Sequence, residues 1–483
     1  MSKKTILALA LLPLLTAGCA VGPDFETPKI DTPADWRIAT PATAVANLPW
    51  WEVFKDKDLQ ILIQTGLEEN KDIKIALARL EQATAAIHIA TAAYLPSVDY
   101  SAGAHRSYGT QGPGTPRPHG FTLGGTVQWE LDLWGRLRRL DESASAQYFA
   151  TEASKNAVVL TLVSEIASGY FRLRLLDAQL ALAQQTAQTR RRAYELAHNK
   201  FENGVGNLID TRLFEAEMHS AQASISEFTR AIALQENALS VLLGRNPGAI
   251  LRQRNAHAVT PDAYPTLPEI PAGIPSGLLQ RRPDILAAEQ RVRAANAQVG
   301  AAIAEYFPRV SLTGALGFIN PSLAHLLENN SMGRQGGGTL LGPLFNGGAI
   351  HHNVRRTKAA TREAVLTYEN VALNAFREVN DALATLQSAR QRITHLEKQT
   401  AALREATEKT RQAYESGTVS FLPVLDADRN LFNAQLLLLD TRTQELDATV
   451  KLYKALGGGW STDGTAPLVD TSGKAALPPP TAR

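Results

Sequence analysis

Residues 309–318 read RVSLTGALGF and residues 121–130 read FTLGGTVQWE, and in both stretches large apolar residues alternate with small or polar ones. Successive side chains of a β-strand point to opposite faces, so a period of two indicates a strand with unlike faces. Residues 97–106 (SVDYSAGAHR) and 336–345 (GGGTLLGPLF) have the same length of ten residues. A tilted strand needs about 9–11 residues to cross a bilayer. The sequence therefore predicts four membrane strands.

These four stretches belong to an internal duplication. Tyr94-Leu95-Pro96 returns as Tyr306-Phe307-Pro308, which is 212 positions later, and Gly135 returns as Gly347 at the same offset. Near the ends of the repeats the offset is 213, as between Gly204 and Gly417. Each half contains a helix, a strand, a loop, a strand, a very long helix, a glycine turn and a returning helix.

The duplication divides the chain into six segments. They are a signal peptide over 1–18, an N-terminal segment and equatorial belt over 19–60, a first repeat over 61–246 with a tip turn at 203–207, an equatorial linker over 247–281, a second repeat over 282–457 with a tip turn at 416–420, and a C-terminal tail over 458–483.

The helical parts predict a tunnel wall. No proline occurs in residues 135–204 or 347–417, so each stretch can run about 100 Å as a helix, at roughly 1.5 Å per residue. The shorter helices Lys71–Tyr94 and Asn207–Leu243, stacked end to end, would match a long neighbour. The long stretches are rich in Ala, Gln, Leu and Arg, which favour helices, and only 6% of the residues are aromatic. We expect long antiparallel coiled-coil helices that form thin walls.

The number of strands requires association. Four strands cannot close a barrel, and open sheet edges in lipid would leave backbone N–H and C=O groups unpaired. Known closed barrels begin at about 8 strands, so two or more copies would be needed. The predicted fold is therefore mixed α and transmembrane β, with a helical tunnel and a β-barrel shared between subunits.

The first residues of the chain predict export and a lipid anchor. Lys3 and Lys4 precede an apolar run over 6–15 that is too short to span a bilayer. Cys19 is the only cysteine and follows small residues, which is typical of a lipobox, where the new N-terminal cysteine carries acyl chains. Ala20 after it indicates sorting to the outer membrane. Thr16, where such boxes usually have leucine, departs from the pattern.

Several segments together resemble the TolC/OprM-like outer-membrane efflux factors, and most closely their NodT-type lipoprotein branch. The resemblance covers nearly the whole chain. The segments that carry it are Val21-Gly22-Pro23-Asp24-Phe25, Pro49-Trp50-Trp51-Glu52-Val53-Phe54, Trp129-Glu130-Leu131-Asp132-Leu133-Trp134-Gly135-Arg136, residues 273–285 (GIPSGLLQRRPDI) and Leu452-Tyr453-Lys454-Ala455-Leu456-Gly457.

The resemblance implies a homotrimer with 12 strands and 12 helical staves, whereas the residues alone leave two and three copies open. It further implies a location in the outer membrane, with the tunnel in the periplasm. The partners that it implies are a periplasmic adaptor, an inner-membrane pump and outer-membrane lipid. The expected function is a passive exit duct for drugs or other toxic solutes.

Channels of this kind are pinched at the periplasmic tip when at rest, and the residues near the two glycine turns are our candidates for this gate. Three copies of an aspartate around one axis would form a ring that attracts cations. Asp426 is the first candidate, and the alternative is a solvated charge near a helix start. The other gate candidates are Arg429, Leu422, Phe421, Asp210 and Arg212. The candidate adaptor contacts are the tip turns, namely Gly204, Val205, Gly206, Gly417, Thr418 and Val419.

Other chemistry finds little support in the sequence. His351 and His352 are adjacent, so they face different sides of a helix and do not predict a metal site. Gly336-Gly337-Gly338 is not followed by the Gly-Lys-Ser/Thr of a phosphate loop, and no Gly-x-Ser-x-Gly motif occurs. The charges nearly cancel, with 49 Lys+Arg against 47 Asp+Glu, which gives no indication of nucleic-acid binding. We expect no cofactor and no catalysis.

Two alternatives remain open from the residues. A lipid-anchored periplasmic coiled-coil adaptor or scaffold would share the long helices, but it has no need of four strands placed symmetrically in a duplicated unit. A lipoprotein enzyme would be indicated by a monomer that stays in solution without detergent. The sequence does not identify the exported substrate, the pump class or the adaptor.

Overall fold

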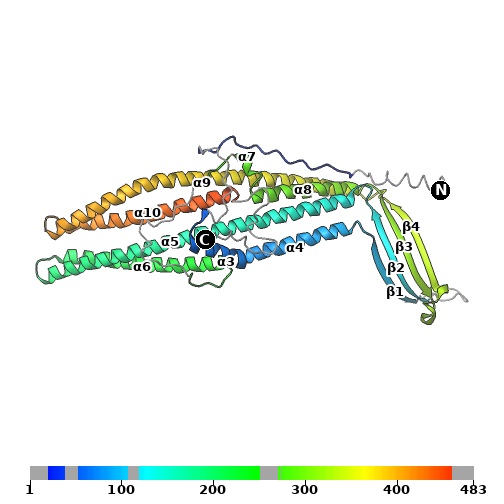
Figure 1. Cartoon of the computed structure of the whole chain (residues 1–483), viewed down its shortest axis with the longest axis horizontal. Helices are drawn as coiled ribbons and strands as arrows, with labels where there is room; N and C mark the ends of the chain where they lie inside the picture. The colour runs from blue at the N-terminus through cyan, green and yellow to red at the C-terminus, as the bar shows by residue number, and fades with distance from the viewer. Residues whose placement is uncertain (1–19, 39–52, 107–118, 251–269, 274, 459–483) are drawn as a thin grey trace, which may run out of the picture. The chain divides into compact units, whose positions relative to one another are not determined.

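The structure is a computed structural model that describes residues 20–38, 53–106, 119–250, 270–273 and 275–458 (Figure 1). The signal peptide and Cys19 therefore lie outside the described residues. The helices and strands, in chain order, are α3 (Lys57–Glu69), α4 (Lys71–Ala92), β1 (Ser97–Arg106), β2 (His119–Leu131), α5 (Arg136–Glu202), α6 (Leu208–Leu242), α7 (Pro275–Leu278), α8 (Pro283–Ala304), β3 (Arg309–Asn320), η2 (Leu323–His325), η3 (Asn329–Ser331), β4 (Met332–Leu341), α9 (Ala349–Glu415) and α10 (Phe421–Ala455).

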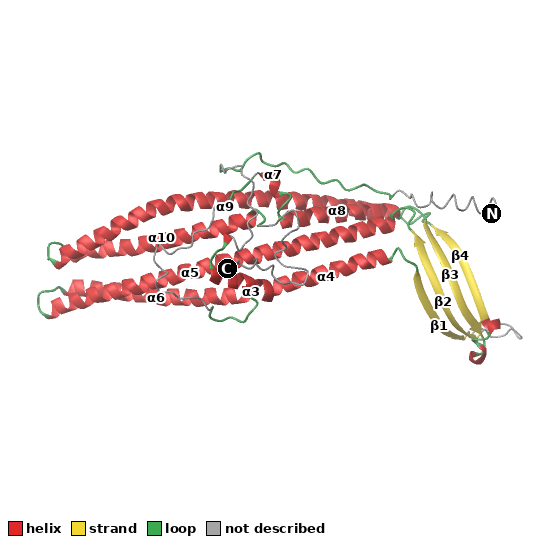
Figure 2. Cartoon of the chain, viewed as in Figure 1, coloured by secondary structure: helices red, strands yellow, loops and turns green. Residues whose placement is uncertain are grey.

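The four strands form one antiparallel sheet in the order β1-β2-β3-β4 (Figure 2). Strand β1 has the predicted bounds, and β2 and β3 extend beyond the predicted ranges at one or both ends. The prediction for the fourth strand was wrong by four residues: the predicted strand ran from Gly336 to Phe345, whereas β4 runs from Met332 to Leu341. Pro343 lacks a backbone N–H and cannot continue the ladder, so the strand ends at Leu341.

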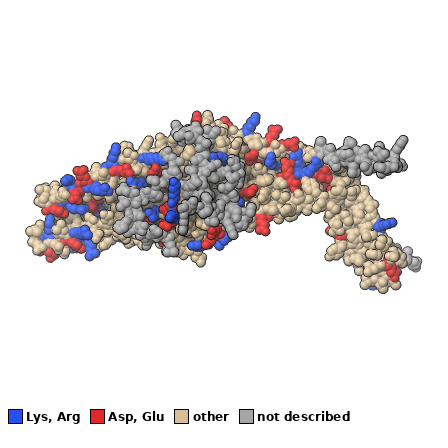
Figure 3. Space-filling view, in the orientation of Figure 1, with Lys and Arg blue, Asp and Glu red and all other residues tan. Residues whose placement is uncertain are grey.

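One face of the sheet is apolar and the other is small or polar. Paired residues share a face and successive residues alternate, so the register assigns every position to one face. The apolar face carries large side chains that stay exposed in the single chain. They are Val98, Tyr100, Leu123, Val127, Trp129, Leu312, Leu316, Met332 and Leu340. The opposite face is mostly Gly, Ser, Thr, Ala and Gln, and its large apolar residues, Ile319 and Leu341, lie near strand ends. Figure 3 shows few charged side chains on the sheet and many of both signs on the helices.

The chain has two compact units. One comprises the described residues up to Lys29, Ala78–Ala153 and Ala287–Asn370, and it contains the sheet. The other comprises Ile30–Leu77, Ser154–Leu286 and the chain from Val371 onward. The helices α5 and α9 have 67 residues each and contribute to both units, as the sequence predicted from their lack of proline.

In the unit with the sheet, aromatic side chains fix the junction between strands and helices. Trp134 stacks on Phe307 with ring centroids 4.8 Å apart, and its Nε1–H donates to the carbonyl oxygen of Pro308 at 2.8 Å. Asp132 accepts hydrogen bonds from the backbone N–H groups of Leu137 and Arg138, both at 3.0 Å, and so caps the start of α5. These contacts explain the local role of residues 129–136.

In the other unit, the short helices meet end to end. Asn70, at the start of α4, donates from its side-chain amide to the carbonyl oxygen of Leu242 at the end of α6, at 2.8 Å. Its Oδ1 also accepts from the backbone N–H of Asp72 at 2.7 Å. The equivalent joint of the second repeat uses Arg282, which donates to the carbonyl oxygen of Ala455 at 3.3 Å.

The main core of this unit lies around α3, a helix that the sequence analysis did not single out. Its apolar face, with Leu59, Ile63 and Leu67 at 0–1% exposure, packs against Phe54 and against α5. Tyr170 of α5 donates from its hydroxyl to Oδ2 of Asp56, the residue that caps α3, at 2.8 Å. The buried apolar side chains of this unit are therefore concentrated around α3.

Candidate functional site

The two tip turns are helix C-caps of the same design. Gly204 and Gly417 each have φ +75°, a left-handed conformation that glycine adopts without steric cost. After the first turn, the N–H of Val205 donates to the carbonyl oxygen of Lys200 at 3.0 Å, and after the second the N–H of Thr418 donates to that of Ala413 at 2.9 Å. A left-handed glycine followed by a bond that closes across the helix end is a Schellman motif. The sequence predicted both glycines as helix ends, and this geometry confirms that prediction.

Aromatic side chains pack directly behind the turns. Phe421, at the start of α10, is 3% exposed, and its ring centroid lies 3.9 Å from that of Phe214 in α6. Tyr414 of α9 lies 6.1 Å from both rings. Burial raises the pKa of the Tyr414 hydroxyl, and the nearby charge of Asp210 raises it further. Phe421, one of the gate candidates, thus lies inside the chain and joins three helices by packing.

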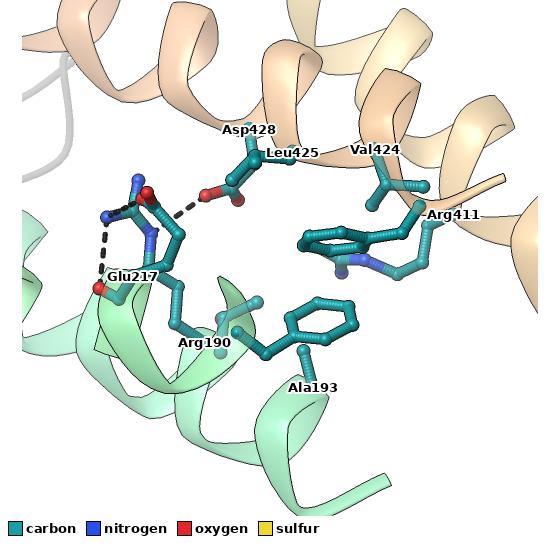
Figure 4. A pocket seen from close by; sticks show the side chains of 10 residues that line it. Arg190, Ala193, Glu217, Arg411, Val424, Leu425 and Asp428 are labelled. Carbon is teal, nitrogen blue, oxygen red and sulfur yellow. Dashed lines mark hydrogen bonds and ion pairs between the residues drawn. The ribbon is translucent and has the colours of Figure 1, made fainter. Parts of the chain in front are cut away.

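A network of four charged side chains lies next to the aromatic cluster, and Figure 4 shows three of them, Arg190, Glu217 and Asp428. Arg190 of α5 contacts Glu217 of α6 at 2.9 Å and Asp428 of α10 at 2.8 Å. The side chains of Arg190 and Glu217 are only 6% and 8% exposed. Glu217 also binds Arg429, whose Nε lies 2.7 Å from its Oε1. Two positive and two negative groups therefore connect α5, α6 and α10 with no net charge.

Arg429 lies at the border of this network. Its hydrogen bond with Glu217 raises the pKa of the guanidinium, and the charge of Asp426 acts in the same direction. The Arg429 side chain is 53% exposed. It therefore lies between the buried ion pairs and the exposed surface of α10.

Of the remaining gate candidates, Leu422, Asp426 and Arg212 lie on exposed surface in the single chain. Leu422 is 67% exposed, and Asp426, one helical turn later, is also exposed. Arg212 pairs with Glu215 of the same helix at 2.6 Å, and Asp210 is half-buried. The structure thus brings Leu422, Asp426 and Arg429 to one side of α10, because residues 3 and 4 apart share a helix face. Val205 at 78% exposure and Val419 at 36% leave both tip turns open to a partner.

A cavity of about 260 Å³ lies between the helices at this level. Phe214, Val424 and Leu196 form its apolar wall, and Arg411 of α9 lines it. Arg411 also lines the smaller neighbouring pocket that contains Arg190 and Glu217 (Figure 4). The ion pairs and the cavity therefore lie side by side, in the part of the wall where the helices of the two repeats meet.

The sequence analysis missed Arg190, Glu217 and Asp428. One signal was available, because Glu217 lies between Phe214 and Ala221 on the buried stripe of α6. A carboxylate on an apolar stripe is almost never fully buried without a partner. The partner itself was not predictable, since Arg190 comes from another helix and Asp428 from the other repeat.

The structure offers no alternative site for a metal or a membrane helix among the residues that it describes. Within the described ranges, no three His, Cys, Asp or Glu side chains gather where they could hold an ion. The rings of His351 and His352 lie 5.3 Å apart, edge to face. No described helix is long and apolar enough to cross a bilayer.

Known proteins resemble this chain along nearly its whole length. The family model for outer membrane efflux proteins matches residues 62–245 and again residues 274–458. The probable efflux pump outer membrane protein TtgC of Pseudomonas putida is 33% identical over 476 residues, which cover 95% of this chain and 96% of that protein. The cation efflux system protein CusC of Escherichia coli (strain K12) is 31% identical over 458 residues, with 93% and 99% covered.

Solved structures give the same result. The open state of the Neisseria gonorrhoeae MtrE outer membrane channel superposes with a TM-score of 0.82 at 30% identity, and the match covers 91% of this chain and 98% of that one. A membrane protein from Pseudomonas aeruginosa superposes with a TM-score of 0.83 at 32% identity, with 92% and 98% covered.

Proposed function

The chain belongs to the outer membrane efflux protein family, and we propose that it is the outer-membrane channel subunit of a tripartite efflux system. Drugs or other toxic solutes would reach it from an inner-membrane pump through a periplasmic adaptor. The channel is a passive duct and not an enzyme. The observation that carries this function is a four-stranded sheet with one apolar face, followed directly by helices of 67 residues.

The sheet also decides against the adaptor or scaffold that the sequence left open. An exposed apolar face with nine large side chains is costly in water and favourable in lipid. Strand β1 pairs only with β2, and β4 only with β3, among the described strands. In a bilayer these two outer edges need partners, and three copies supply 12 strands. The homotrimer thus follows from the family and answers the edge problem of the single chain.

We propose that the tip carries the gate and the adaptor contacts. Leu422 and Asp426 are exposed on α10, and Arg429 connects them to the buried network. Opening would require α6 and α10 to separate, which breaks the contact between Glu217 and Arg429. Asp210 and Arg212 would contribute from α6, and Phe421 would support the gate by packing. The exposed turns at 203–207 and 416–420 would receive the adaptor.

We further propose a lipid anchor at Cys19 and keep the predicted division of the chain. Cys19 lies outside the described residues, as do residues 39–52 and 251–269 of the belt segments. The residues that follow the cysteine are placed, however, and the N–H of Val21 donates to the carbonyl oxygen of Trp134 at 3.0 Å. The described residues after the cysteine thus lie beside the segment that follows β2.

The test combines size exclusion in detergent with planar-bilayer recording. The wild-type protein should run as a trimer and conduct, and Asp426→Ala should weaken block by multivalent cations at least about tenfold. Each carboxylate near the axis contributes about 1 kcal/mol at 4 Å even in water, and three copies act together. The control is Glu408→Gln, which removes an exposed carboxylate from α9. A monomer without conductance would refute the channel, and unchanged block in Asp426→Ala would refute the gate.

A further inference from the structure

The register in which the outer strands of the sheet, β4 and β1, would pair between two copies can be derived from the pairing of β2 with β3 inside one chain. This inference rests on the proposed channel, in which copies of the chain share a barrel. Strands β2 and β3 belong to the first and second repeat, so their ladder is a junction between one repeat and the next. The missing ladder, between β4 of one copy and β1 of the next, is also a junction between a second-repeat strand and a first-repeat strand.

The repeats define which residues are equivalent. Each residue of β1 corresponds to the residue 212 positions later in β3, as Ser97 does to Arg309. Ser97 lies opposite Gln128, and Arg309 lies opposite Leu341. Leu341 is therefore the equivalent of Gln128, so β4 corresponds to β2 at an offset of 213 residues.

Transferring the internal junction to the outer edges fixes the pairs. Within the chain, Val127 lies opposite Gly314. The residue 213 positions after Val127 is Leu340, and the residue 212 positions before Gly314 is Ala102. We propose that β4 of one copy pairs antiparallel with β1 of the next copy, with Leu340 opposite Ala102 of that copy and the rest of the ladder in the same register.

The two faces of the sheet support this register independently. Leu340 and Ala102 both belong to the apolar face, as the observed pairs of Leu340 with Val310 and of Ala102 with Leu123 show. A slip of one residue would bring the apolar face of one copy next to the polar face of the other. Only the proposed register and slips of an even number of residues keep the faces continuous.

Side-chain size and charge discriminate against a slip of two. In the proposed register, the bulky residues His105 and Arg106 of β1 lie opposite Gly337 and Gly336 of β4. Bulky side chains thus meet positions that have none. A slip of two in one direction would instead place Arg106 opposite Arg334, and like charges directly opposite each other are destabilising. A slip of two in the other direction would set His105 against Thr339 and lose its match with Gly337.

The test is a disulfide between copies. Directly opposite residues in antiparallel strands have Cα atoms about 4.5–5.5 Å apart, within the range of about 4.4–6.8 Å that a disulfide needs. A slip of two residues moves them by about 6.8 Å along the strand. The double variant Ala102→Cys with Leu340→Cys should therefore form covalent dimers and trimers on a non-reducing gel after mild oxidation in isolated outer membranes.

Matched variants make the result specific. Tyr100→Cys or Ala104→Cys, each with Leu340→Cys, reports the two slipped registers and should give few covalent oligomers. Val127→Cys with Gly314→Cys reports the internal template and should close within one chain, since a Cβ at Gly314 has no heavy atom within 4 Å. The wild type, which retains Cys19, should give no covalent oligomers.

Two outcomes would overturn the register. Either a slipped pair cross-links better than the Ala102 and Leu340 pair, or the internal pair closes while no pair between copies does. A detergent-solubilised trimer that still conducts would then retain the proposed function and reject only this register. A monomer that does not conduct would reject both.

Discussion

At the scale of single residues, Glu217 has an unusual position. It is a carboxylate with 8% exposure that faces two arginines, Arg190 from α5 and Arg429 from α10. Taking charges out of water is expensive, so such a group is stable only while its partners stay in place. The network therefore stabilises one arrangement of the three helices and penalises any movement that separates them.

Glu217→Gln should loosen the tip without altering the rest of the chain. The substitution keeps the size of the side chain but removes the carboxylate that pairs with Arg429 and leaves Arg190 with the carboxylate of Asp428 alone. Breaking a buried pair in this way costs about 3–5 kcal/mol, and the half-exposed Arg429 places the expected loss at the lower end. We expect a lower midpoint of thermal unfolding in detergent and longer open times in planar bilayers.

The same helix provides a control for this variant. Glu227→Gln removes the partner of Arg230, but this ion pair is exposed, with side chains 60% and 63% accessible. Exposed pairs contribute little to stability, so neither the thermal midpoint nor the open time should change. Equal effects of the two substitutions would show that the network has no special role at the tip.

At the scale of elements, glycines with the same backbone conformation have different surroundings. Gly204 and Gly244 have φ +75° and +72°, so an alanine at either position is strained. A Cβ at Gly204 would have no heavy atom within 4 Å, whereas one at Gly244 would lie 2.2 Å from the carbonyl oxygen of Glu69. Gly204 only reverses the chain, and Gly244 also allows the end of α6 to approach the joint of α3 and α4.

Gly204→Ala should therefore cost about 1 kcal/mol of folding stability, with conduction preserved. Gly244→Ala should be much more harmful, because backbone atoms have to move. We expect a large loss of folded trimer, measured by yield in detergent and by thermal unfolding. Similar stabilities of the two variants would show that the backbone of Glu69 and Asn70 can move at little cost to make room for a Cβ at residue 244, and would contradict this prediction.

The elements also show how far sequence reasoning reaches. Alternation and the repeat placed β1 correctly, but the fourth strand was displaced because Gly333, Gly336, Gly337 and Gly338 have no side chains to alternate. The end-to-end stacking of the short helices was predictable from length. Its chemistry was not, since equivalent positions hold Asn70 in one repeat and Arg282 in the other.

At the scale of the whole molecule, the duplication gives one chain two similar halves, but the network around Glu217 occurs once among the described residues. Arg190 and Glu217 come from the first repeat, and Asp428 and Arg429 from the second. The position 213 residues after Glu217 is Asn430, so the second repeat cannot build the same site. The six repeats of a trimer would therefore carry three such networks, one in each copy, and any gate would be threefold.

The number of subunits that contribute Asp426 to the gate can be measured. Wild-type and Asp426→Ala subunits, co-expressed with different affinity tags, should assemble into channels with zero, one, two or three altered copies. Because the carboxylates would share one axis, multivalent cation block should then fall into four discrete levels among single channels, in binomial proportions set by the expression ratio. Mixtures of wild type with Glu408→Gln should give one level. Three levels would indicate a dimer, and a single level in the Asp426→Ala mixture would place that carboxylate away from the pore.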